Sequence, residues 1–125
     1  MTSPNAIELL ATARELLLQQ LLPALPEALH YECRMVASTL AMAAREIERG
    51  AEAGRIEEGS LADVLGLHGL AGLTAEDART LLAQFIRQGM FDPPGKGRDA
   101  LLQGLAGITR ARLSISNPKV LADER

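Results

Sequence analysis

The chain has 125 residues, the size of one ordinary domain with a single core, and 47% of them are hydrophobic, which excludes wholesale disorder. Only 2% are aromatic, so Leu, Ala, Ile, Val and Met must form the core, and this palette predicts an all-α fold. The formal net charge of −3 provides no attractive field for nucleic acid.

Cysteine usage and hydropathy predict the cellular compartment. Cys33 is the only cysteine, so no intrachain disulfide can form and a reducing cytoplasm is the expected setting. The opening residues, MTSPNAIELL, lack the basic and then apolar layout of a signal peptide. No apolar run approaches the roughly 20 residues that a membrane-spanning helix needs. We therefore expect a soluble cytoplasmic protein that does not bind a membrane.

The first two predicted helices form a pair. The first runs from Ser3, a capping residue followed by Pro4, to Leu22, where a proline stops it. The second begins at Pro26 and ends at Gly50. Only the sequence PALP separates them, so we expect an antiparallel hairpin.

Three helical segments follow the pair. A capping signal at Ser60 predicts a short helix over residues 60–65, and glycines then break the chain. Thr74 caps a helix that ends at Gly89, where Met90 is placed to close a Schellman contact. The last helix runs from about Arg98 to Ser116. The expected architecture is a single helical domain over residues 1–125, a bundle of four main helices and one short one.

The first helix is apolar over about 240° of its circumference at 100° per residue. Its clean polar stripe contains only Glu8, Thr12, Glu15 and Gln19. Two interpretations remain open. Either this is the central helix and the other helices surround it, or a second protein covers part of it, and in that case Leu9, Leu16 and Leu17 are candidate interface residues.

The second helix carries two apolar sides. The main stripe includes Cys33, which we expect to be a small buried hydrophobe rather than a nucleophile. Almost opposite lie Tyr31, Met35 and Met42, residue types that are common at partner surfaces. Either another helix of the same chain covers this patch or a partner does. The second interpretation predicts a homo-oligomer, with a dimer favoured.

Signals for chemistry are weak. His30 and His68 are the only histidines, and no Cys/His cluster or HExxH spacing is present, so we expect neither a metal site nor a cofactor. His68 lies in a glycine-rich loop and is expected to be solvated. No nucleophile elbow is found, and no catalytic residue is assigned. The sequence thus favours a non-enzymatic protein.

The arginines offer the other candidate site. Arg34 and Arg45 lie about 20° apart on the second helix. Arg112 projects onto the apolar stripe of the last helix, where its guanidinium must be paired or reach water. The candidate carboxylate partners are Glu15, Glu32 and Glu46. These arginines either form structural ion pairs or bind an anion between helices, such as a phosphate or a carboxylated metabolite.

Three segments resemble a known family: PNAIELLATARELL, RMVASTLAMAAREIERG and RARLSISNPKVL. The family consists of small uncharacterised all-helical bacterial proteins and is catalogued as a domain of unknown function, and the likeness covers nearly the whole chain. Its genes often lie beside those of aminoglycoside-phosphotransferase-like kinases and acyl-CoA dehydrogenases. The resemblance therefore implies an accessory role in acyl-CoA catabolism and carries over no catalytic or binding residue.

Two functional hypotheses result. The first is a non-enzymatic accessory or protein-interaction subunit that self-associates, or that docks on a phosphotransferase-like kinase or an acyl-CoA dehydrogenase. The alternative is a small-molecule binding module or minor enzyme in which Arg34, Arg45 and Arg112 bind an anionic metabolite or an acyl-CoA type of ligand.

Overall fold

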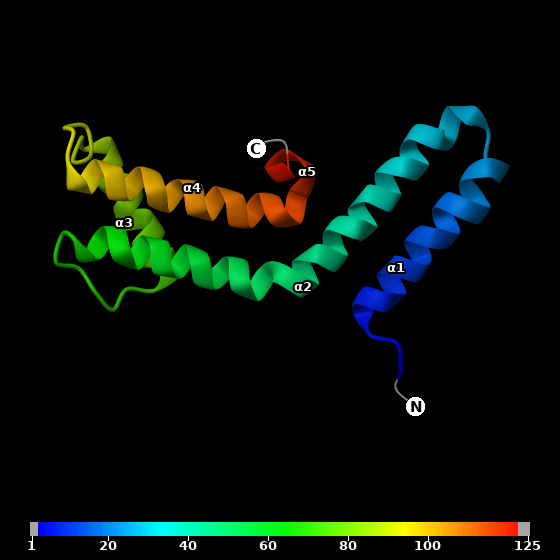
Figure 1. Cartoon of the computed structure of the whole chain (residues 1–125), viewed down its shortest axis with the longest axis horizontal. Helices are drawn as coiled ribbons and strands as arrows, with labels where there is room; N and C mark the ends of the chain where they lie inside the picture. Colours follow the sequence, from blue (N-terminus) through cyan, green and yellow to red (C-terminus); the bar gives the residue numbers. More distant parts are fainter. Residues whose placement is uncertain (1–2, 123–125) are drawn as a thin grey trace. The chain divides into compact units, whose positions relative to one another are not determined.

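The computed structural model describes residues 3–122. It is 82% helical and its described part contains no strand, so the all-α prediction is confirmed (Figure 1). The α-helices are α1 (Ala6–Leu16), α2 (His30–Gly66), α3 (Ala75–Arg87), α4 (Lys96–Ser116) and α5 (Pro118–Ala122). Four are long and one is short, as expected, although the short helix is α5 rather than a segment over residues 60–65.

The described residues fall into two compact units. We call residues 3–51 with 114–122 the hairpin unit, and Glu52–Leu113 the core unit. The prediction of a single domain over residues 1–125 stays a prediction, because compact units of one chain can belong to one domain.

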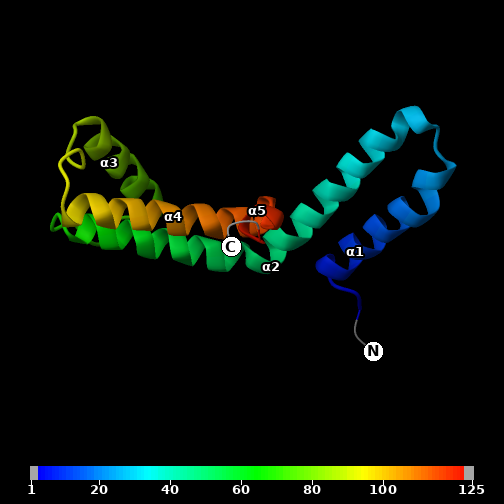
Figure 2. The ribbon, with the colours of Figure 1, turned by 45° about the horizontal axis from the view of Figure 1, so that its top comes forward.

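In the hairpin unit, α1 and the first half of α2 lie side by side and run in opposite directions, as predicted (Figures 1 and 2). Cys33 is 5% exposed and its thiol donates to the Leu17 carbonyl, with an S···O distance of 3.8 Å. Asn5, not Ser3, caps α1, because the extended backbone at Asn5 lets its side-chain oxygen accept the Glu8 N–H at 2.9 Å.

The turn of the hairpin is helical for longer than the sequence predicts. After α1 the chain forms a π-helical turn over Leu17–Leu21, in which the Leu22 N–H bonds to the Leu17 carbonyl. A 3₁₀ turn over Leu22–Ala24 follows. Pro23 is tolerated in that first turn because its missing N–H has no partner to lose there. A second 3₁₀ turn, Glu27–Leu29, leads into α2.

The predicted end of the second helix at Gly50 is wrong, because α2 continues without a break to Gly66. Glycine inside a helix costs about 1 kcal/mol relative to alanine. Burial of neighbouring apolar side chains, including Ala53, Leu61 and Val64, outweighs that cost. The separate helix expected at residues 60–65 is therefore the last part of α2.

The core unit is built from the second half of α2, α3 and most of α4. Its buried cluster consists of Leu61, Val64, Leu65, Ala78, Leu82, Phe91 and Leu101. Helix α4 lies along α2 in both ribbon views (Figures 1 and 2). Gly104 permits this approach, since a Cβ atom there would lie 3.4 Å from Cγ2 of Val64.

Local signals placed α3 correctly. The Thr74 hydroxyl accepts the Asp77 N–H at 3.1 Å, which confirms the predicted cap. At the other end, Gly89 has φ +82° and the Met90 N–H bonds to the Phe85 carbonyl at 3.1 Å. This geometry is the predicted Schellman motif.

Candidate functional site

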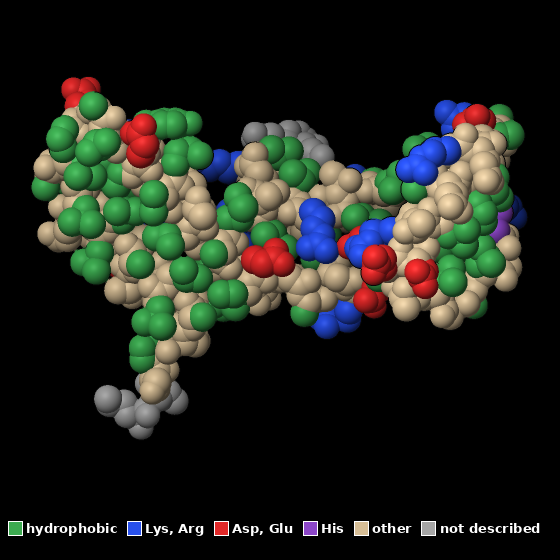
Figure 3. Space-filling model, turned by 180° about the vertical axis from the view of Figure 1, so that it is seen from behind, with side chains coloured by type: hydrophobic (Ala, Val, Ile, Leu, Met, Phe, Trp, Pro, Cys, Tyr) green, Lys and Arg blue, Asp and Glu red, His purple; other side chains and the backbone are tan. Residues whose placement is uncertain are grey.

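Large apolar side chains gather on the surface of the hairpin unit (Figure 3). We call this set the hairpin surface. It contains Leu9, Leu16, Leu21, Leu29, Tyr31, Met35, Val36, Met42 and Ile47, all of them exposed. In agreement with this exposure, no residue of α1 is buried. The hairpin unit therefore shows to solvent the kind of surface that a helix pair normally hides.

Most of the predicted interface residues belong to the hairpin surface. Leu9, Leu16, Tyr31, Met35 and Met42 have exposed fractions from 40% for Met42 to 69% for Tyr31. Within the hairpin unit no residue of α1 is buried, so α1 is not the central helix of that unit. Within the hairpin unit, no other helix covers the patch on α2 either.

Leu17 is the exception among the predicted interface residues. It is half-buried and is the first residue of the π-helical turn. Its own carbonyl accepts the hydrogen bond from the Cys33 thiol. Its side chain therefore belongs partly to the packing between α1 and α2. The wider π turn changes the direction of the residues after Leu16, which a constant 100° per residue does not anticipate.

Two arginines of α2 bind the end of α4 within the hairpin unit. Nε of Arg45 donates to the Ile115 carbonyl at 2.6 Å, and a terminal nitrogen of Arg49 donates to the Ser114 carbonyl at 2.6 Å. The last carbonyls of a helix have no partner within it and carry the negative end of its dipole. Arg45 and Arg49 together therefore act as a C-terminal cap. Arg49 was not among the arginines predicted from the sequence to form a site.

Arg45 also lines a cavity of about 370 Å³ between α1 and α2. Arg14 is the other charged residue there, and the remaining lining residues are leucines and alanines. The two helices of the hairpin thus do not fill the space between them.

Arg112 forms an ion pair in the core unit. One of its terminal nitrogens lies 3.1 Å from Oε2 of Glu57, while Arg79 donates to Oε1 of the same carboxylate at 2.7 Å. The Glu57 side chain is only 12% exposed. The hydrogen bond from Arg79, followed by that from Arg112, lowers the pKa of Glu57 against the opposing effect of desolvation.

The three predicted ligand-binding arginines are not gathered into one site within either unit. Arg34 is exposed and makes no hydrogen bond or ion pair within residues 3–122. Arg45 caps α4, and Arg112 belongs to the other unit, where it is paired with Glu57. Arg45 and Arg112 thus bind oxygen atoms of the protein itself.

Other candidate chemistry is sparse in the described residues. They contain no group of three or more His, Cys, Asp and Glu side chains that could hold a metal ion. The His68 ring packs edge-on against Phe91, with centroids 5.3 Å apart, and lies 6.0 Å from the Phe85 ring. His68 thus attaches its loop to the core unit instead of being only solvated. No helix in residues 3–122 is both long and apolar enough to cross a membrane.

The fold and its contacts define a small all-α protein of two helical units whose partly buried arginines bind protein oxygens. The family model described as Domain of unknown function (DUF6285) matches residues 23–120. The chain belongs to this family. Helix α1, with Leu9 and Leu16, lies outside the matched segment. Comparisons with curated proteins and with solved structures gave no match.

Proposed function

We propose that this protein is a non-enzymatic interaction subunit that pairs with a second copy of itself through the hairpin surface. One observation carries the proposal: α1 has no buried residue although apolar side chains cover most of it. An isolated helix of 11 residues is marginal in water. Such a helix needs a packing partner over more than one side.

The energy at stake is large enough for association. Full burial of one Leu, Ile, Val or Met side chain contributes roughly 1.5–3 kcal/mol. The half-exposed side chains of the hairpin surface therefore leave on the order of 10 kcal/mol unrealised in each copy. In a symmetric dimer both copies bury this surface, so the favourable free energy is doubled. It is opposed by an association cost of about 4–15 kcal/mol.

A second copy fits this surface for two reasons. A two-fold interface brings the same patch of each copy together, so it needs no complementary charge pattern, and the side chains of the hairpin surface carry no charge. Two helical hairpins can also close into a four-helix bundle, which covers both apolar sides of the first half of α2.

The arginine-based alternative has less support. The guanidinium groups of Arg45 and Arg112 already bind protein oxygens, and no single unit contains all three arginines. We therefore do not propose a binding module or minor enzyme for an anionic metabolite.

Sedimentation over a dilution series tests the proposal. We expect a dimer that dissociates on dilution. The double variant M35E/M42E should be monomeric with unchanged helical circular dichroism, because both side chains are exposed and charges would be buried in the dimer. L102E is the matched control, since Leu102 is an exposed leucine of the core unit. It should dimerise like the wild type.

Tyr31 supplies an independent readout, because it is the only tyrosine and the chain has no tryptophan. Acrylamide quenching of its fluorescence should weaken as the protein concentration rises. A monomer at every concentration, or a dimer that L102E disrupts and M35E/M42E leaves intact, would overturn the proposal. A complex with a phosphotransferase-like kinase or an acyl-CoA dehydrogenase, formed by the monomer through the hairpin surface, would replace the second copy as its occupant.

A further inference from the structure

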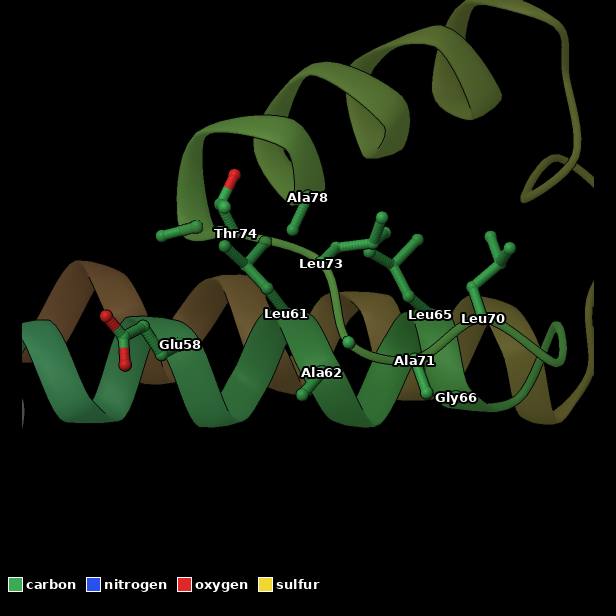
Figure 4. A pocket seen from close by; sticks show the side chains of 12 residues that line it. Glu58, Leu61, Ala62, Leu65, Gly66, Leu70, Ala71, Leu73, Thr74 and Ala78 are labelled. Atoms are coloured by element: carbon green, nitrogen blue, oxygen red, sulfur yellow. The ribbon is translucent and has the colours of Figure 1, made fainter.

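A cavity of about 450 Å³ lies in the core unit and shares no residue with the hairpin surface (Figure 4). The last turns of α2 form one side, the segment over residues 70–74 forms another, and the first turn of α3 closes it. Its volume falls within the range of about 300–1,000 Å³ that is typical of small-molecule sites.

The cavity has a buried apolar floor and an exposed rim. Leu61, Leu65 and Ala78 line it and are buried, whereas Leu73 and Glu58 line it and are exposed. Figure 4 shows the leucine side chains gathered between α2 and α3. Such a surface accommodates an aliphatic chain, which gains free energy from burial without needing directed hydrogen bonds.

Backbone hydrogen bonds fix the loop wall of the cavity. Gly69 adopts φ +76°, and the Leu70 N–H bonds to the Leu65 carbonyl at 3.1 Å. This Schellman motif turns the chain back at the end of α2, and Leu70 and Leu65 both line the cavity. The edge-on contact of the His68 ring with Phe91 attaches the same loop to the core. The cavity is therefore part of the fold rather than a gap beside a free loop.

The polar groups at the cavity select the charge of a ligand. Glu58 and Thr74 are the only lining residues with polar side chains. The Thr74 hydroxyl already accepts the Asp77 N–H, whereas the Glu58 carboxylate makes no hydrogen bond or ion pair within residues 3–122. The Glu58 carboxylate repels a carboxylate or phosphate and attracts a cation.

We propose that the cavity binds an aliphatic amine: a linear alkyl chain lies against Leu61, Leu65 and Leu73, and its ammonium group pairs with Glu58. The proposal concerns the core unit alone and does not depend on self-association. The ligand also has the opposite charge to the one considered for the arginines: a negatively charged side chain recognises a cation here, whereas the arginines would bind an anion.

Titration of the full chain with decylammonium, decanol and decanoate, each below its micelle concentration and followed by amide NMR shifts, tests the proposal. Decylammonium should bind about tenfold more tightly than decanoate, because attraction to Glu58 replaces repulsion. The preference should shrink as salt is added. Decanol should bind with intermediate affinity, and all shifts should centre on residues that line the cavity.

Three variants make the result decisive. E58Q should abolish the preference for the amine while decanol still binds, and the matched control D63N, an exposed acid of α2 that does not line the cavity, should keep the preference. A62F should fill the cavity from the exposed side of α2 and weaken all three ligands. Equal binding of amine and carboxylate, or a preference that survives in E58Q, would overturn the proposal. The dimer-disrupting variant M35E/M42E should bind decylammonium normally, so failure here is distinct from failure of the self-association proposal.

Discussion

The carboxylate of Glu57 on α2 binds the guanidinium of Arg112 on α4 across 55 residues of sequence, with a separation of 3.1 Å. Arg79 on α3 reaches the other oxygen of the same carboxylate. One acidic side chain thus joins all three helices of the core unit. The Glu57 side chain is 12% exposed, whereas the two arginine side chains are about half exposed. The carboxylate, unlike the guanidinium groups, therefore needs its ion-pair partners to compensate for lost hydration.

Replacing Glu57 with Gln should destabilise the protein by roughly 1–2 kcal/mol at neutral pH, because both ion pairs are lost and the NH2 group of Gln cannot accept a hydrogen bond from the second arginine. Urea unfolding measures this difference. The neighbouring variant E58Q is the control, since Glu58 is exposed and unpaired within residues 3–122, and its stability should change little.

The same ion pairs predict a pH dependence. The pKa of Glu57 is lowered in the folded protein, so its stabilising contribution is fully present above the ordinary glutamate pKa of about 4.3 and is lost as the pH falls through the lower folded value. The stability difference between wild type and E57Q should therefore narrow below about pH 4. A difference that stays constant down to the acid transition would show that the negative charge of Glu57 does not contribute to it.

The cap on α4 can be removed with R45M/R49M. Both arginines donate to the last carbonyls of that helix, so we expect a loss of about 2–4 kcal/mol and faster amide exchange in α5. R34M, which removes an exposed α2 arginine without a hydrogen bond or ion pair among residues 3–122, should be neutral. Equal effects of both variants would mean that loss of charge, rather than of the cap, is responsible.

Two glycines should respond to alanine in opposite directions. Gly59 lies inside α2, and a Cβ atom at this position would meet open space, so G59A should stabilise the protein by about 0.5–1 kcal/mol. Gly69 has φ +76°, a conformation that alanine adopts only with strain, so G69A should destabilise it by about 1 kcal/mol. Thermal unfolding of the two variants measures both effects, and shifts in the same direction would contradict this account of the end of α2.

The core should be sensitive to truncation where it is buried. L82A removes a side chain that is 4% exposed and should cost about 2–5 kcal/mol. L102A removes one that is 55% exposed and should cost well below 1 kcal/mol. Denaturant unfolding of both variants compares the two sites directly, and similar losses would contradict the assignment of the core.

Features that depend on a few adjacent residues could be predicted from the sequence. The Thr74 cap and the Schellman turn at Gly89 are local, because each needs only one side chain or one glycine in the right backbone conformation. The hairpin of the first two helices followed from the short connection between them.

Features that depend on tertiary packing could not be predicted from the sequence. Gly50 was expected to end the second helix, but buried side chains such as Ala53 keep α2 helical there. Because that stretch was expected to be a connection, Glu57 was not recognised as a partner of Arg112. The carbonyls that Arg45 and Arg49 bind are backbone groups, which leave no trace in the sequence pattern.

The π-helical turn at Leu17–Leu21 has a consequence for how this chain can vary in length. A π turn holds one residue more than the α-helical turn it replaces. Deleting one residue here returns the segment to α geometry and leaves the chain from Leu22 onward in place. The same deletion within α1 would rotate every later side chain of the helix by about 100°. We therefore expect this chain to tolerate the deletion of a single residue in the connection between the two hairpin helices.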